Sequence, residues 1–436
     1  MPLLLLLFLS FGSAEAAPDG TSWSPSTYVR AALEASPELA QSRENLVAAQ
    51  ARLDSQFAHT YFPTLSFSAS MTPAKLAAGS RFTFEAWRLN ANDIDLNPAL
   101  NWNLFNSWQD ARSLKGTSLA RDMSREDYAS AQQSRVIAAL QTYYGLLQAQ
   151  KLAEVSKQNL QSQHEAYLLT QDRYNHGMKS LSDLLKTETD WRSAELDVAT
   201  DEAQERLALF RFNSLIKRDE GLPAVLETSL ILGTTDIPVL EAGLRAALID
   251  RPEIRKNRME LETADINFRQ ALQSALPTLA LDFGLSHAVA ADFMQPTDSF
   301  GWRAAVYGFT LRLALPASFN FYSQFKNVRA AQATWRKSRN ASEELRRDIR
   351  EQVYQAHIGL LRAVQSYEIS VRKEDISKQN LDIVLEQYSQ GSADVIRLSQ
   401  ARLDYVNSQV QRMRAFYDAS INRAEYRRAA GERLWP

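Results

Sequence analysis

The sequence predicts a mainly α-helical protein with a transmembrane β part, built from two tandem repeats of helix, strand, strand, long helix and helix. Three observations support this fold class. The two halves of the chain align with each other at a constant shift. Two stretches with heptad-like apolar spacing indicate helices longer than a compact domain needs. Four short segments alternate apolar and polar residues, which is typical of β-strands with one apolar face.

The repeat is clearest around the short helix break at Arg173–Ser180. A shift of 214 positions places Tyr174 on Tyr388 and Gly177 on Gly391. The same shift aligns further identical residues: Pro63 with Pro277, Phe105 with Phe319, Gly145 with Gly359, Leu184 with Leu398, and Asp190 with Asp404. A single register that persists through helices, turns and strands indicates a tandem duplication.

Composition excludes several classes of function. Lys and Arg number 49 and Asp and Glu 51, so the near balance of charge gives no support for nucleic-acid binding. The absence of cysteine excludes disulfides, thiolate zinc sites and a lipid-bearing N-terminal cysteine. The five histidines show no metal-ligating spacing, and no set of nucleophile, base and oxyanion donors is recognisable. We therefore expect no enzymatic activity, no catalytic residue, no cofactor and no metal.

The first residues are expected to form an export signal peptide over residues 1–16. An apolar run at Leu3–Leu9 precedes the small-x-small pattern Ala14-Glu15-Ala16, which makes Ala17 the expected mature start. No basic residue precedes the leucines, which departs from the usual pattern. No later run of about 18 apolar residues predicts a membrane-spanning helix.

The first repeat is expected over residues 17–216, with strands at about 63–72 and 93–105. Apolar and polar residues alternate along both segments, and a loop at about 73–92 joins them. Pro98 lies inside the second strand and cannot donate to a ladder. It therefore predicts a bulge or a local loss of pairing.

Helices account for the rest of the first repeat. A helix is expected over 27–58, with Pro37 breaking or kinking it near its start. A helical hairpin is expected at about 108–216, with Gly177 in its tip. The first arm carries a seam at heptad-like spacing formed by Val136, Leu140, Tyr143 and Leu147. At 1.5 Å per residue this arm would extend roughly 95 Å.

A linker at residues 217–238, expected to form an equatorial region, leads to the second repeat at 239–436. The repeat follows the same order: a helix at about 239–275, strands at about 277–287 and 302–315, and a helical hairpin at about 320–430. Its long helix carries a second apolar seam: Leu345, Ile349, Val353, Ala356, Leu360 and Val364.

The four predicted strands indicate that several chains together form a closed β-barrel. Their lengths are near the roughly 9–11 residues that cross a bilayer as tilted β-strands. Four strands cannot close a barrel, and an open edge is not tolerated in lipid. Three chains of four strands would supply 12, so we expect an exported homotrimer in contact with membrane lipid. The alternative class is a soluble periplasmic coiled-coil scaffold with a soluble sheet.

Several motifs make the sequence similar to a known family. They are the Pro-x-Leu junctions at Pro63 and Pro277, Leu104-Phe105-Asn106 before the long helix, and Arg173-Tyr174-x-x-Gly177-x-x-Ser180-x-x-Asp183 at the tip. With these motifs and the duplication, the chain resembles the TolC family of outer-membrane efflux proteins. The resemblance implies a trimer with a 12-stranded outer-membrane β-barrel and a long periplasmic α-helical barrel.

The resemblance also implies a function. The expected protein is an outer-membrane channel that passively conducts substrates as the exit duct of a tripartite efflux pump. Its helix tips would dock onto a periplasmic adaptor, also called a membrane fusion protein, and through it onto an inner-membrane pump. The outer-membrane component of a type I protein secretion system uses the same kind of duct and is an open alternative.

The resemblance implies specific contacts for the two tips. Residues expected to face the adaptor are Arg173, Tyr174, Gly177 and Ser180 in the first tip and Tyr388 and Gly391 in the second. Family members can carry acidic residues six and nine positions after the second glycine, where this chain has Arg397 and Gln400. The candidate residues for a periplasmic gate are therefore Asp183, Asp394 and Arg397. We expect Asp183 and Arg397 of adjacent hairpins to pair and hold the pore shut.

Overall fold

A computed structural model describes residues 22–71, 94–227, 237–273, 278–289, 306–314 and 321–434. The expected signal peptide, the loop at about 73–92 and the Pro277 junction lie outside these residues, as does part of the linker. The chain divides into two units, which are described separately. Unit 1 comprises Met1–Ala40, Ala131–Arg251 and Ile349–Pro436, and unit 2 comprises Gln41–Ser130 and Pro252–Asp348.

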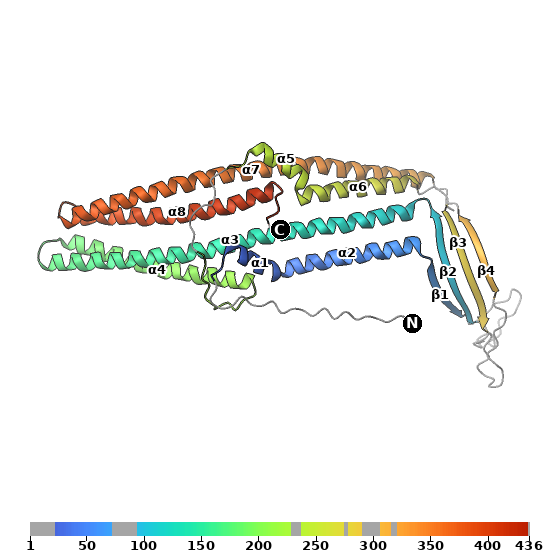
Figure 1. The fold of residues 1–436 in the computed structure, drawn as a ribbon, viewed down its shortest axis with the longest axis horizontal. Helices are drawn as coiled ribbons and strands as arrows, with labels where there is room; N and C mark the ends of the chain where they lie inside the picture. The colour runs from blue at the N-terminus through green and yellow to red at the C-terminus, as the bar shows by residue number, and fades with distance from the viewer. Residues whose placement is uncertain are drawn as a thin grey trace, which may run out of the picture. The chain divides into compact units, whose positions relative to one another are not determined.

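The two halves of the chain contain the same elements in the same order (Figure 1). The first half contains α1 (Pro25–Glu34), α2 (Pro37–Tyr61), β1 (Thr64–Met71), β2 (Ile94–Asn106), α3 (Gln109–Asn175) and α4 (Leu181–Leu215). The second contains α5 (Leu240–Asp250), α6 (Pro252–Gln273), β3 (Thr278–Val289), β4 (Val306–Ala314), α7 (Phe321–Ser389) and α8 (Val395–Ala429). The predicted tandem repeat with a long fourth element is confirmed, since α3 has 67 residues and α7 has 69.

The opening helix of each half is interrupted at a proline. α1 ends at Glu34 and α2 begins at Pro37, as the sequence led us to expect. In the second half α5 ends at Asp250, and Arg251 takes an extended conformation before α6 begins at Pro252. Proline suits the first position of a helix and disfavours the helical conformation in the residue before it. The prediction of one helix over about 239–275 was therefore wrong at this point.

Unit 2 contains an antiparallel sheet with the strand order β1-β2-β3-β4 (Figure 1). The register pairs Leu65 with Leu100 and Leu100 with Phe283, and it pairs Thr64 with Asn101. Directly opposed residues in a sheet lie on the same face. Apolar residues are thus gathered on one face and polar residues on the other. Leu65 and Phe67 are more than half exposed, so nothing in the described part of this chain covers the apolar face at these positions.

Pro98 affects the pairing of β2 on one side only. It lies opposite Phe67 in the register with β1, whereas the register with β3 has no partner for Asn97 or Pro98. The expected local loss of pairing is therefore found on the β3 side, where proline offers no N–H to a ladder. The bulge lies elsewhere, between Asn103 and Phe105.

The core of unit 1 forms where α1 packs on α3 and α4. Tyr28 stacks on Phe212 with their ring centroids 4.0 Å apart, and its hydroxyl donates to the Phe212 carbonyl oxygen at 3.0 Å. Tyr143 of α3 completes this buried aromatic cluster. Arg135 donates to the last carbonyl of α4, that of Leu215, at 2.8 Å. Stacked aromatic rings with satisfied polar ends fix the position of α1 on the α3–α4 hairpin.

Both predicted seams lie in the interior of the described structure. In α3, Val136, Tyr143 and Leu147 are buried, and Leu140 packs against the same cluster. In α7 the buried members of the seam are Ile349, Val353, Leu360 and Val364. The heptad-like spacing therefore identified the faces of the long helices that pack inside the protein.

The aromatic cluster predicts a large loss of stability for one substitution and a small loss for its near neighbour. Phe212 is 0% exposed, whereas Phe210 on the same helix is 44% exposed. Phe212→Ala should destabilise the protein by about 3–5 kcal/mol, because it removes a buried ring and leaves a cavity. The measurement is the thermal midpoint of the helical circular dichroism signal in detergent. Phe210→Ala is the control, and an equal fall of the midpoint in both variants would contradict the assigned core.

Candidate functional site

The turn that ends α3 is built on a glycine in the left-handed conformation. Gly177 has φ +70° and donates its N–H to the carbonyl of Tyr174 at 2.9 Å. The N–H of Met178 donates to the carbonyl of Arg173 at 2.8 Å. These two bonds form a Schellman motif, which satisfies the last carbonyls of a helix and requires a residue that tolerates positive φ. The turn at Gly177 is where the sequence predicted it.

The turn that ends α7 has the same construction. Gly391 has φ +77° and donates to the carbonyl of Tyr388 at 3.1 Å, while Ser392 donates to the carbonyl of Gln387 at 2.8 Å. Each of these residues lies 214 positions after its counterpart in the first turn. Figure 1 shows the two turns at the same end of unit 1. The duplication has therefore preserved the hydrogen bonding of the turn as well as its glycine.

The candidate gate residues have local structural roles. Ser180 and Asp183 form a capping box at the start of α4: Asp183 N–H donates to Ser180 Oγ at 3.1 Å, and Ser180 N–H donates to Asp183 Oδ2 at 3.3 Å. Asp394 caps α8 by accepting from the Arg397 N–H at 2.8 Å. Such caps satisfy amides at a helix start. Among the described residues of the single chain, no ion pair joins Asp183 to Arg397.

The two tips meet at Tyr388. The guanidinium carbon of Arg173 lies 5.0 Å from the centroid of the Tyr388 ring, and Lys179 Nζ lies 6.0 Å from it. Tyr388 is 6% exposed, whereas Tyr174, its counterpart in the first repeat, is 37% exposed. A cation near the face of an aromatic ring is attracted by the ring quadrupole. The sequence did not single out Lys179, because nothing in its local pattern indicates a contact with a residue so distant in the chain.

Polar contacts join the hairpins further along the helices. Ser399 of α8 donates to Asp190 of α4 at 2.8 Å, and Lys186 forms an ion pair with the same carboxylate. Arg402 of α8 donates to the carbonyl of Ser162 in α3 at 3.0 Å. Burial lowers the pKa of the Arg402 guanidinium from its ordinary value. These contacts hold the α3–α4 and α7–α8 hairpins side by side next to the tips.

Exposed apolar side chains surround the first tip. Met178 is 65% exposed, and Leu181 and Leu185, which follow in α4, are also more than half exposed. Ile396 has a similar exposure at the start of α8. Apolar side chains gathered at an exposed helix tip are typical of a surface that binds another protein.

A sequence profile of outer membrane efflux proteins matches the chain twice, at residues 28–216 and 243–432. The chain belongs to the outer membrane efflux protein family. One match falls in each half, which agrees with the tandem duplication, and together they cover well over half of the chain. The resemblance drawn from the tip and junction motifs is therefore confirmed.

Solved structures of three outer membrane proteins have the same fold. CmeC, an outer membrane channel of Campylobacter jejuni, gives a TM-score of 0.78 at 18% identity, over 94% of this chain and 87% of CmeC. VceC of Vibrio cholerae gives a TM-score of 0.77 at 16% identity, over 94% of this chain and 97% of VceC. The open state of the MtrE channel of Neisseria gonorrhoeae gives a TM-score of 0.75 at 18% identity, over 94% of this chain and 89% of MtrE. At these identities the likeness establishes the fold.

Family membership has direct consequences for this chain. Members of the family are homotrimeric channel components of efflux systems in the outer membrane. The expected outer-membrane localisation and the expected role in efflux are confirmed.

Within the described ranges, no helix combines the length and apolar character needed to cross a membrane. In the same part of the chain, no group of three or more His, Cys, Asp or Glu side chains is arranged to hold a metal ion.

The contact at Tyr388 predicts an asymmetry between the two tips. Tyr388→Leu keeps an apolar side chain but removes the ring, so it should lose a cation–π attraction of about 0.5–2 kcal/mol. Hydrogen–deuterium exchange at the Gly391 and Ser392 amides should become faster. Tyr174→Leu is the control, because its ring is exposed, and exchange at the first turn should stay the same. Equal effects of the two variants on their own turns would contradict the role assigned to Tyr388.

Proposed function

We propose that three copies of this chain form the passive exit duct of a tripartite efflux pump. Substrates would pass from a periplasmic adaptor and inner-membrane transporter to the exterior. The observation that carries the proposal is the sheet of unit 2. Among the described residues, β1 and β4 each have one neighbouring strand, and apolar residues share one face. A four-stranded sheet of this kind needs further strands before it can stand in lipid.

A sheet in lipid must have no open edge, because unpaired backbone groups in hydrocarbon cost several kcal/mol each. Joining β1 of one copy to β4 of the next would remove both edges, and three copies would supply 12 strands. The apolar face, which includes Leu65, would then contact lipid. The polar face would line water. Its side chains already have hydrogen-bond partners across the sheet: the Asn101 side chain donates to Ser66 Oγ at 3.3 Å, and the Thr64 hydroxyl donates to the backbone carbonyl of Asn101 at 3.1 Å.

The tips supply the contact with the adaptor in this proposal. Exposed apolar side chains at Met178, Leu181 and Leu185 lie beside a turn that both repeats build in the same way. The adaptor-facing residues predicted from sequence are grouped around these turns. Tyr388 is buried in an apolar cluster with Val384 and Leu398, so it contributes by fixing the tip, and Tyr174 has the more accessible ring.

In-cell photo-crosslinking tests the docking surface. A photoreactive amino acid at Met178 or Leu181 should capture a periplasmic adaptor, because these side chains are exposed at the tip. Leu196 is the control, since it is equally exposed on α4 but lies away from the turn. The identity of the captured protein also separates drug or ion efflux from type I secretion. Capture of the same proteins from all three positions would contradict docking through the tips.

The gate proposal keeps Asp183 and Arg397 of adjacent hairpins as partners. It takes the two hairpins from neighbouring copies, because no ion pair joins these residues within the described part of one chain. Asp183 already accepts the Ser180 N–H, which fixes its carboxylate at the start of α4. A capping carboxylate has further lone pairs, so it can accept from a guanidinium as well. Asp394 is the N-cap of α8, the position that Ser180 occupies in the first hairpin, and it holds the start of α8 beside Arg397.

Charge exchange tests this pair. Asp183→Arg and Arg397→Asp should each raise the conductance of the closed channel in planar bilayers, because like charges then face each other. The double exchange should lower it again. Ser180→Ala removes one capping bond but keeps both charges, so it should leave conductance near that of the wild-type channel. Unchanged conductance in both single variants would rule out the pair as a gate.

A further inference from the structure

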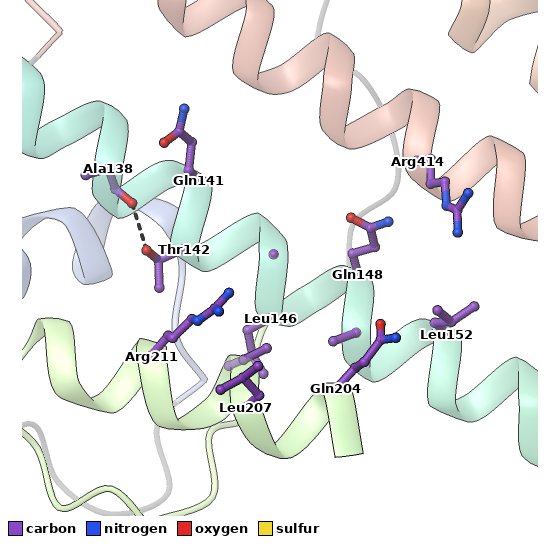
Figure 2. A pocket seen from close by; sticks show the side chains of 13 residues that line it. Ala138, Gln141, Thr142, Leu146, Gln148, Leu152, Gln204, Leu207, Arg211 and Arg414 are labelled. Carbon is purple, nitrogen blue, oxygen red and sulfur yellow. Dashed lines mark hydrogen bonds between the residues drawn. The ribbon is translucent and has the colours of Figure 1, made fainter. Parts of the chain in front are cut away.

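One face of unit 1 carries two adjoining grooves that meet at Arg414. The first lies over α3 between α4 and α8 and has a volume of about 590 Å³. The second lies between α7 and α8 and has a volume of about 490 Å³. Arg414 of α8 lines both. Figure 2 shows the first groove, with Arg211 projecting from α4 and Arg414 from α8 on opposite sides of α3.

The grooves combine an apolar floor with polar and cationic walls. In the first, Leu146, Leu152 and Leu207 form apolar lining, while Gln148 and Gln204 present side-chain amides. Gly145 also lines it, and a Cβ placed there would meet no atom within 4 Å. The floor at Gly145 is therefore open to the groove.

The cations of this surface outnumber its carboxylates. Arg211, Arg362, Lys373 and Arg414 line the two grooves, against the single carboxylate of Asp418. Lys373 donates to Gln411 at 2.7 Å. No hydrogen bond or ion pair to another described residue is found for the side chains of Arg211, Arg362 or Arg414. Guanidinium groups with free donors beside apolar surface are suited to carboxylate or sulfonate ligands.

The first groove lies on the opposite side of α3 from α1. Tyr143 of α3 packs against Tyr28 of α1. Residues two positions apart on an α-helix point roughly 200° apart, so Gly145 and Gln141 face away from Tyr143. Of the two sides of the α3–α4 hairpin, one is thus covered by α1 and the other carries the groove.

We propose that this surface binds anionic amphiphiles, that is, carboxylates or sulfonates with an apolar body. The apolar body lies on Leu152 and Leu207, and the anionic group accepts hydrogen bonds from Arg211 and Arg414. The surface then faces the interior of the duct and favours anionic substrates. This placement rests on the proposed function, whereas the binding itself does not.

Equilibrium fluorescence titration of the purified protein in a non-ionic detergent tests the binding. The probe is an undecanoic acid that carries a dansyl group, and its uncharged methyl ester is the reference. The acid should bind about tenfold more tightly than the ester, which corresponds to one charge-assisted hydrogen bond. The triple variant Arg211→Gln, Arg362→Gln, Arg414→Gln should bind acid and ester equally.

Two further variants make the result specific. Arg206→Gln removes an exposed cation of α4 that lines neither groove, and it should retain the preference for the acid. Gly145→Leu places a side chain on the open floor, where an added Cβ meets no atom within 4 Å, and it should weaken binding of both acid and ester. Equal binding of acid and ester by the wild-type protein, or a preference retained in the triple variant, would overturn the proposal. If the proposed function were wrong and the binding proposal right, the protein would show no conductance in bilayers but would still bind the acid more tightly than the ester.

Discussion

The two open edges of the four-stranded sheet are the constraint on which the rest of this structure depends. β1 and β4 each pair on one side, and apolar side chains on one face are exposed to whatever surrounds the chain. Lipid solvates that face well but offers no hydrogen bond to an open edge. A single chain cannot satisfy both conditions, and a closed ring of copies can. The need for a closed ring of copies therefore follows from backbone hydrogen bonding.

The duplication gives two tips with one backbone design and different surroundings. Both turns use the same Schellman bonds, and both following helices begin with a side-chain cap. The side chains around them have diverged, since Arg173 and Lys179 of the first tip cover Tyr388 of the second. One repeat thus stabilises the pair of hairpins, while the apolar residues near Met178 stay exposed. Divergence after duplication has given the two tips different exposure around the same backbone turn.

The sequence predicted the parts of the fold that depend on local patterns. Residues close together in the sequence predicted three features: the alternation in the strands, the seam through Tyr143 and the glycines of the tips. The break at Arg251 was missed, although Pro252 carried the same signal as Pro37 in the first repeat. The contacts at Tyr388 and the cations at Arg211 and Arg414 could not be predicted. They arise from helices brought together by tertiary packing, and their sequence separations give no local sign of proximity.

The most direct test of the account is the mass of the signal-processed protein after detergent extraction, together with its distribution between membrane and soluble fractions. The account predicts a membrane-bound species of three chains that needs detergent for extraction, because the open edges and apolar face are satisfied only in a closed barrel. A monomer recovered in buffer without detergent would contradict it. In that case the sheet would be a soluble one, and the long helices would form a scaffold and not a duct.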